Sequence, residues 1–373
     1  MLRLNLILPV GRSPQRSHSG LFRLMQVVLF AALLPVCDAG TPLGLPTAPG
    51  DGPLPELAKL GRSLFSDKRL SADGTVSCAS CHMPDHAFTD ARPTARGIRG
   101  QLLTRHTPSL LNVRYAKSLF WDGRVADLET QAHFPLLARA EHGLPSKESV
   151  GDIVRADASY ADAFRRLCGV EKGGISIREV AAAIAAYERT LVAGDSPIDR
   201  YLYAADSTAI GPEAKRGLAL FRGRAQCVTC HTLGATSALL TDDQFHASAL
   251  PIPASALGRL GALTNQVATL RKKGQTEVLN ALISTDRDVA GLGRFIVTLD
   301  PKDIGQFKTP SLRNVALTGP YMHDGSVATL AESIDLELYS RSARSYPLVL
   351  SEDERADLLA FLQALASPKM GKR

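Results

Sequence analysis

Two short stretches decide the fold, CASCH at residues 78–82 and CVTCH at residues 227–231. In each stretch two cysteines stand three positions apart, and a histidine directly follows the second cysteine. The sequence contains six cysteines, and four of them lie in these two stretches. One spacing that occurs twice in 373 residues indicates a repeated site rather than a chance pattern.

The pattern C-x-x-C-H is the attachment signature of c-type haem. Two thiols at this spacing reach both vinyl groups of one porphyrin, and the adjacent imidazole meets the iron from the same side. We therefore predict two covalently bound haem c groups, each with a proximal histidine ligand. The residues concerned are Cys78, Cys81, His82, Cys227, Cys230 and His231. Half of a zinc site or a redox-active C-x-x-C pair is the alternative, and two matches disfavour it.

The repeat extends beyond these two stretches. TPSLLNV at residues 107–113 returns as TPSLRNV at residues 309–315. Fourteen residues after each proline comes an Asp-Gly pair, at residues 122–123 and 324–325. The chain is therefore predicted to contain two related haem domains that arose by internal duplication, too few copies for a solenoid.

The remaining patterns are mainly helical. SIRE at residues 176–179 is a capping box that opens an amphipathic helix, and SEDE at residues 351–354 opens another. No stretch shows the sustained alternation typical of a strand. We predict an all-α fold with an N-terminal haem domain at residues 40–200 and a C-terminal one at 201–373. Residues 245–294 have no counterpart in the first half and are expected to form helix plus loop.

Residues 1–39 are predicted to be a cleavable signal peptide. Arginines precede an apolar run at residues 25–36, which is too short to span a bilayer as a helix but matches a signal h-region. Small residues suit cleavage after Ala39. We therefore expect the mature protein in the periplasm. Lipid attachment through Cys37 and anchoring by an uncleaved stem are the alternatives.

Charge excludes one class of partner. The formal net charge is +6, and no strong basic cluster marks a nucleic-acid footprint. The run RKK at residues 271–273 is interpreted as a solvated helix face. Cys168 belongs to neither C-x-x-C-H stretch and is expected to be a buried free thiol.

These residues together resemble the bacterial di-haem cytochrome c peroxidase family, which includes the MauG-type enzymes. The resemblance runs from about residue 55 to residue 365 and adds FWDGR at residues 120–124 and YMHDGS at residues 321–326 to the repeats above. It implies hydrogen peroxide as substrate. It also implies a small electron-donor protein (a cytochrome c or a cupredoxin) or, in a MauG-like oxidase, a protein substrate. A di-haem electron carrier without catalysis is the remaining interpretation, and a homodimer stays open.

The resemblance also implies roles for three side chains. Trp121 matches the tryptophan that relays electrons between the two haems, and a packing residue at the domain interface is the alternative. Gln131 and Glu141 match the residues of the peroxide pocket. There a carboxylate moves a proton between the two peroxide oxygens, while an amide orients the peroxide. Without the resemblance, Gln131 and Glu141 would be interpreted as a pair on a helix surface.

Two departures from the family concern the iron ligands. Ile98 stands where typical peroxidases carry a distal histidine, so the first haem is expected to be five-coordinate and open, as in MauG-type enzymes. At the second haem, the position of the usual methionine ligand falls on Glu337. MauG-type enzymes use a tyrosine there, so Tyr339, two residues further on, is predicted as the sixth ligand. An ordinary interface tyrosine is the alternative.

A third departure concerns calcium. Family members bind Ca²⁺ between the domains through backbone carbonyls that match Thr318 and Pro320 and through an asparagine side chain. Here His106 takes the place of the asparagine. Calcium prefers hard oxygen ligands, so the imidazole puts the calcium site in doubt.

Overall fold

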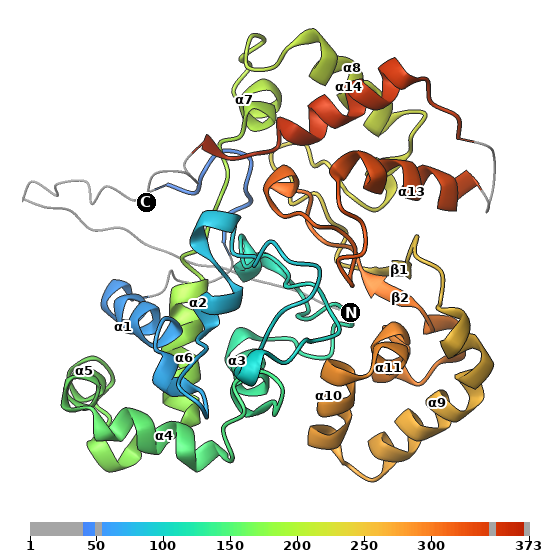
Figure 1. Cartoon of the computed structure of the whole chain (residues 1–373). Coiled ribbons are helices and arrows are strands. Elements are labelled where there is room, and N and C mark those ends of the chain that lie inside the picture. The colour runs from blue at the N-terminus through green and yellow to red at the C-terminus, as the bar shows by residue number, and fades with distance from the viewer. Residues whose placement is uncertain (1–39, 49–53, 343–347, 369–373) are drawn as a thin grey trace, which may run out of the picture. The chain divides into compact units, whose positions relative to one another are not determined.

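The computed structural model describes residues 40–48, 54–342 and 348–368 (Figure 1). The predicted signal peptide and its cleavage site lie outside the described residues. Residues 41–373 form one compact unit. Helices dominate this unit and its strands are short, which confirms the prediction of a mainly α-helical fold. None of the described helices is long and apolar enough to cross a membrane.

The α-helices are α1 (Pro55–Phe65), α2 (Cys78–Cys81), α3 (Leu128–Leu137), α4 (Lys147–Ala156), α5 (Ala158–Cys168), α6 (Ile177–Glu188), α7 (Pro197–Tyr203), α8 (Pro212–Arg222), α9 (Ala254–Lys272), α10 (Thr276–Thr285), α11 (Arg287–Gly291), α12 (Phe295–Thr298), α13 (Leu330–Ser342) and α14 (Glu352–Gln363). Short 3-10 helices are η1 (Lys68–Leu70), η2 (Pro84–His86), η3 (Ile98–Gly100), η4 (Val113–Tyr115), η5 (Lys172–Gly174), η6 (Cys227–Thr229), η7 (Pro301–Asp303) and η8 (Val315–Leu317). The strands β1 (Phe245–Ala247) and β2 (Gln306–Lys308) pair antiparallel.

Both predicted capping boxes open helices at the expected places. At the start of α6, the backbone N–H of Ser176 donates to the Glu179 carboxylate at 2.9 Å. At the start of α14, the N–H of Ser351 donates to Glu354 at 2.8 Å. Each side chain thereby satisfies a backbone donor that has no partner inside the helix.

The duplication is visible in two matching helix crossings (Figure 1). Helices α1 and α6 cross at Gly61, where an added Cβ would lie 1.8 Å from the carbonyl oxygen of Ala183. Helices α8 and α14 cross at Gly217, where an added Cβ would lie 1.9 Å from the carbonyl oxygen of Asp357. In each pair only a glycine lets the two backbones approach this closely. The same device in both halves supports two related domains.

The described residues form four hydrophobic core clusters, of which three are larger and are enclosed by helices. The first gathers α1, α3, α4, α5 and α6 around Phe65 and Phe164, and the second gathers α7, α8, α13 and α14 around Phe221 and Phe361. The third lies among α9 to α12. The boundary predicted after residue 200 falls inside α7, and Ile198 of that helix packs in the second core. The chain therefore passes to the second core before α7.

The segment without a counterpart in the first half is helical, as expected, and joins the rest through the short sheet. Phe245 pairs with Lys308, and Ala247 pairs with Gln306, in antiparallel register. In Figure 1 helices α9, α10 and α11 lie beside this sheet. The segment therefore forms an additional wall next to strand β2 and the residues that follow it.

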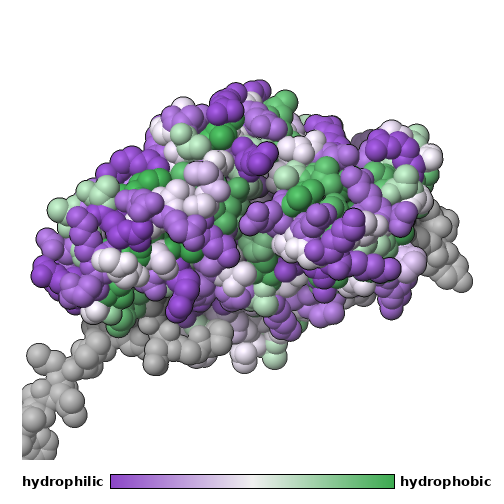
Figure 2. All heavy atoms as spheres, turned by 90° about the horizontal axis from the view of Figure 1, so that it is seen from below, coloured by the Kyte–Doolittle hydropathy of each residue, from purple (hydrophilic) through white to green (hydrophobic). Residues whose placement is uncertain are grey.

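The surface bears out one expectation and corrects another. Arg271, Lys272 and Lys273 are exposed at the end of α9, as predicted for a solvated helix face. Cys168 is exposed, and the expectation of a buried thiol was wrong. It is the last residue of α5, where Gly169 in a left-handed conformation ends the helix at the surface. On the face shown in Figure 2, apolar residues are interspersed among polar ones.

We expect Gly61→Ala and Gly217→Ala each to destabilise the haem-loaded protein by about 1–3 kcal/mol, because the new methyl group would overlap a backbone carbonyl. Gly258→Ala in α9 is the matched control, since an added Cβ there meets nothing within 4 Å. It should be neutral or slightly stabilising, because alanine favours a helix over glycine. Thermal unfolding followed by circular dichroism measures all three. Equal midpoints for the three variants would contradict the close crossings.

Candidate active site

One continuous cavity of about 540 Å³ connects the two C-x-x-C-H stretches. Residues from both halves of the duplication form its largely apolar wall. The wall contains the predicted attachment residues Cys78, Cys81, His82, Cys227, Cys230 and His231. All the described cysteines are free, so both pairs of thiols are available for attachment. The structure thus brings both predicted haem sites to one internal space.

The two histidines are prepared as metal ligands by matching hydrogen bonds. Nδ1 of His82 lies 3.0 Å from the carbonyl oxygen of Phe88, and Nδ1 of His231 lies 2.9 Å from that of Leu240. A carbonyl oxygen can only accept, so Nδ1 carries the proton and Nε2 keeps its lone pair for iron. Burial lowers the pKa of His82, and it lowers that of His231 to about 4. Both rings are therefore neutral at pH 7, the form that binds a metal.

The thiols of the first pair are equally suited to attachment. Burial raises the pKa of Cys78 and raises that of Cys81 to about 12, so both thiols stay protonated. Ser77 and Ser80 form a capping box that starts α2 and holds Cys78 at the beginning of a short helical turn. Free thiols, an oriented imidazole and an apolar cavity together fit c-type haem.

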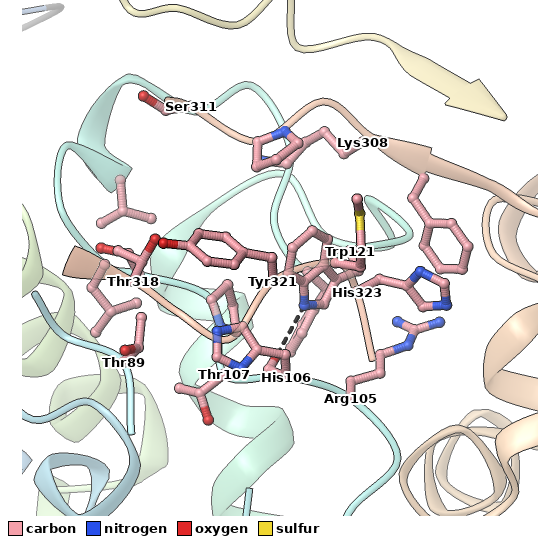
Figure 3. Close-up of a pocket in the computed structure, with 18 of the residues that line it drawn as sticks. Thr89, Arg105, His106, Thr107, Trp121, Lys308, Ser311, Thr318, Tyr321 and His323 are labelled. Carbon is pink, nitrogen blue, oxygen red and sulfur yellow. Dashed lines mark hydrogen bonds between the residues drawn. The ribbon is translucent and has the colours of Figure 1, made fainter. Parts of the chain in front are cut away.

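The two halves of the molecule exchange hydrogen bonds at the middle of the cavity. The residue before each Thr-Pro pair donates its backbone N–H to the residue before the Asp-Gly pair of the other half. These bonds join His106 to the carbonyl oxygen of His323 at 3.0 Å and Lys308 to that of Trp121 at 2.9 Å. Figure 3 shows these four residues together. Equivalent segments of the duplication thus meet across a local pseudo-twofold axis.

Trp121 lies at this meeting point and lines the cavity. Its indole Nε1 donates to the backbone carbonyl of His106 at 2.9 Å, the bond drawn in Figure 3. Its own carbonyl accepts the bond from Lys308 of the other half. The indole is thereby fixed in the wall of the cavity that the two C-x-x-C-H stretches share.

Asp122, the next residue, anchors this loop. It is fully buried and forms ion pairs with Arg105 at 2.7 Å and Arg124 at 2.8 Å. Burial alone would raise the pKa of Asp122, but the two guanidinium groups outweigh it and hold the pKa below its usual range. Arg294 donates to the backbone carbonyls of Asp122 and Gly123. The loop that carries Trp121 is therefore held on both sides.

The predicted peroxide-pocket residues lie in the wall of the same cavity. Gln131 comes from α3, and Glu141 follows that helix. Ile98 is buried, and its backbone N–H donates to the Glu141 carbonyl at 2.9 Å. Its side chain packs against Gly143 and is not part of the cavity wall. Residue 98 therefore contributes nothing to the cavity wall.

Sequence reasoning missed a partner of Glu141. The hydroxyl of Ser284, from α10, donates to Oε1 of Glu141 at 3.0 Å. Burial raises the pKa of Glu141, and the Ser284 hydrogen bond partly opposes this. Ser284 belongs to the segment that has no counterpart in the first half, so no repeat could have pointed to it.

At the second site the structure does not bring Tyr339 to the cavity. Its side chain is 74% exposed and forms no part of the cavity wall. In α13 the buried residues Ile334 and Leu338 face the core, and Tyr339 is turned away because each helical residue rotates by about 100°. Glu337, at the position of the family's usual methionine, lines the cavity instead.

The residues at the expected calcium position do not fit this ion. Thr318 and Pro320 line the cavity, as the resemblance implies. Nδ1 of His106, however, donates to the carbonyl of Arg92 at 2.8 Å, and the His106 carbonyl is engaged by Trp121. The side chain that should supply a hard oxygen is therefore an imidazole already held elsewhere.

The fold and the paired C-x-x-C-H sites define the class as a di-haem c-type protein. A family model described as di-haem cytochrome c peroxidase matches residues 55–207. The chain is 37% identical over 317 residues to methylamine utilization protein MauG of Methylorubrum extorquens, covering 83% of this chain and 78% of that protein. It is 36% identical over 368 residues to cytochrome-c peroxidase IdrP1 of Denitromonas iodatirespirans, covering 92% and 93%.

Solved structures agree with these relatives. A MauG-like protein associated with microbial copper homeostasis superposes with a TM-score of 0.69 at 30% identity, covering 90% of this chain and 96% of that chain. The chain belongs to the di-haem cytochrome c peroxidase family, which includes MauG. It is a peroxidase-type oxidoreductase of a family that uses haem c.

We expect Ser284→Ala to raise the pKa of Glu141, because the hydroxyl donates to the carboxylate and so favours its ionised form. Ser284→Thr keeps the hydroxyl and should leave the pKa near that of the parent protein. Infrared spectroscopy across a pH titration measures the Glu141 carboxyl band, identified by its loss in Glu141→Gln. The hydrogen bond has no such role if the Ala and Thr variants titrate alike.

Proposed function

We propose that this protein is an exported di-haem c peroxidase that reduces hydrogen peroxide at the first C-x-x-C-H site. Electrons come from a small redox protein, a cytochrome c or a cupredoxin, and pass through the second site. The observation that carries the proposal is the wall of the first site. It presents Glu141 and Gln131, while Ile98 leaves the position of a distal ligand empty of any coordinating group.

Haem c, when bound by Cys78, Cys81 and His82, supplies an iron that binds peroxide and exchanges electrons. The side chains of this chain supply the proton transfers. Glu141 takes the proton from the inner peroxide oxygen and returns it to the outer one, and the amide of Gln131 orients the peroxide. Burial raises the pKa of Glu141 above its usual range, which makes the carboxylate a stronger base for the proton that it must accept and return.

Trp121 serves as the electron relay between the two sites. Its indole lies in the cavity wall and donates to the backbone carbonyl of His106, while its own backbone carbonyl accepts from the N–H of Lys308. An indole can be oxidised and can delocalise the resulting radical. A rigid position between two redox sites supports this role over that of a packing residue alone.

A MauG-like oxidase is the second candidate, in which the oxidising equivalents leave through a partner protein's residues. The absence of an iron ligand at Ile98 and the similarity to MauG favour it. A pure electron carrier is disfavoured, because carriers close both irons with two ligands each. In both the peroxidase and the MauG-like oxidase, Glu141 and Gln131 act on the peroxide. The two enzymes differ in which molecule is oxidised afterwards.

Electron paramagnetic resonance of the oxidised, haem-loaded protein tests the proposal. We expect one high-spin signal from the open first site and one low-spin signal, both diminished by one equivalent of peroxide. Glu141→Gln should slow this loss by about 100-fold or more, the usual contribution of a general acid–base group. Two low-spin signals that ignore peroxide would contradict the proposal and favour a carrier.

Steady-state turnover then separates the two enzymatic versions. A peroxidase consumes peroxide continuously with reduced cytochrome c or cupredoxin as the only electron source. A protein that reacts with peroxide but shows no turnover with either donor is instead a MauG-like oxidase that needs a protein substrate.

A further inference from the structure

Glu188, the last residue of α6, is a buried carboxyl group that the proposed chemistry does not use. It is 4% exposed, and it is one of the residues that line the haem cavity. Its Oε2 atom is buried without any hydrogen-bond partner. An unpaired carboxylate in such a place is costly, and the group avoids the cost by keeping its proton.

The charged groups around Glu188 do not supply a counter-ion. Its neighbour Arg189 is held by the Glu129 carboxylate of α3 through two bonds of 2.7 and 2.8 Å. The titratable groups facing the cavity side and the same helix are Cys78 and Tyr187. Helices α1 and α4 also pack on α6. Among the described residues, no charged side chain of either helix shifts the pKa of Glu188.

The balance of these influences leaves Glu188 as a neutral acid at pH 7. Burial raises its pKa to about 8; Arg189 opposes this rise, and Glu129 adds to it. Glu141, another acid of the cavity wall, is distinguished by its hydrogen bond from Ser284. Glu188 therefore titrates close to neutrality without any partner that fixes its protonation state.

We propose that Glu188 is a proton-binding site coupled to the oxidation state of the first haem site. In the pH range where its carboxyl is ionised in the oxidised protein, it takes up a proton from solvent when that site gains one electron. The added electron makes the cavity more negative, and in a low-dielectric space this favours the neutral carboxyl. The coupling is reciprocal, so protonation of Glu188 raises the reduction potential. The inference rests on haem attachment at Cys78 and Cys81 and not on the peroxide reaction.

Such a coupling would serve the proposed function. Reduction of hydrogen peroxide to two waters consumes two protons with two electrons. Glu141 only moves a proton within the peroxide and brings none from outside. If Glu188 gains a proton when the haem site gains an electron, it brings one of the required protons into the cavity. That proton balances the negative charge of the added electron.

The sign of the effect follows from the titration. Below about pH 8 Glu188 is neutral, and above it the ionised carboxylate stabilises the oxidised site. The reduction midpoint of the first haem should therefore fall as pH rises through this range. In Glu188→Gln, which mimics the neutral acid, the midpoint should stay at the low-pH value of the parent protein.

Spectroelectrochemical titration of the haem-loaded protein at a series of pH values, without peroxide, measures this. Glu171→Gln removes an exposed acid of the same domain and should keep the parent pH dependence. The midpoint of the second haem is an internal reference that Glu188→Gln should leave unchanged. A parent midpoint that is flat with pH, or a Glu188→Gln variant that keeps the full slope, overturns the inference.

A second readout covers the case in which Glu188→Gln does not incorporate haem. Redox-difference infrared spectra of the parent protein, recorded at a pH above about 8 where the Glu188 carboxyl is ionised in the oxidised protein, should show a protonated carboxyl band, sensitive to deuterium, that grows on reduction of the first haem. Its absence overturns the inference. Failure of the proposed peroxidase function would look different, because peroxide would have no effect while the redox titration and its pH dependence persisted.

Discussion

The exchange of backbone hydrogen bonds between the two halves is the constraint on which the site depends. His106 of the first half binds the carbonyl of His323, and Lys308 of the second half binds the carbonyl of Trp121. Each bond ties a Thr-Pro segment to an Asp-Gly loop of the other half. An unpaired buried backbone group costs free energy. If either Asp-Gly loop moved away, the backbone N–H of the opposite Thr-Pro segment would lose its hydrogen bond. The cavity is therefore a property of the pair of domains.

Within this symmetric frame the two halves have diverged. Asp122 is buried between two arginines, whereas Asp324, its counterpart, only caps the local turn through the N–H of Ser326. The Trp121 indole donates to the backbone carbonyl of His106 in its own half, whereas His323 stacks on Phe307 with ring centroids 3.8 Å apart. The two sites also differ in their walls, with Gln131 and Glu141 at the first site and Glu337 at the second.

Local sequence signals were sufficient for much of the fold. These signals are the C-x-x-C-H stretches, the TPSL repeats and the capping boxes at Ser176 and Ser351, and each spans only a few residues. The two capping boxes open helices where they predict them. The site is harder to predict, because its parts come from distant segments. Ser284 reaches Glu141 across 143 residues from a segment that the first half lacks.

The departures have equally physical reasons. The prediction for Tyr339 failed because it did not account for the position of this residue around helix α13. Tyr339 is one residue after the buried Leu338, so its side chain points to the surface. Glu188 follows from the sequence only as the end of an amphipathic helix, since its burial is decided by how α3 and α6 meet the cavity. Contacts of this kind are set by three-dimensional packing and leave no pattern along the chain.

The central claim is that Trp121, fixed between the halves, joins the two haem sites into one redox unit. Electron paramagnetic resonance of Trp121→Phe, frozen shortly after one equivalent of peroxide, tests this most directly, because phenylalanine keeps a ring but is much harder to oxidise. The account predicts that the high-spin signal of the first site is lost while the low-spin signal of the second persists. Loss of both signals at the parent rate would contradict it.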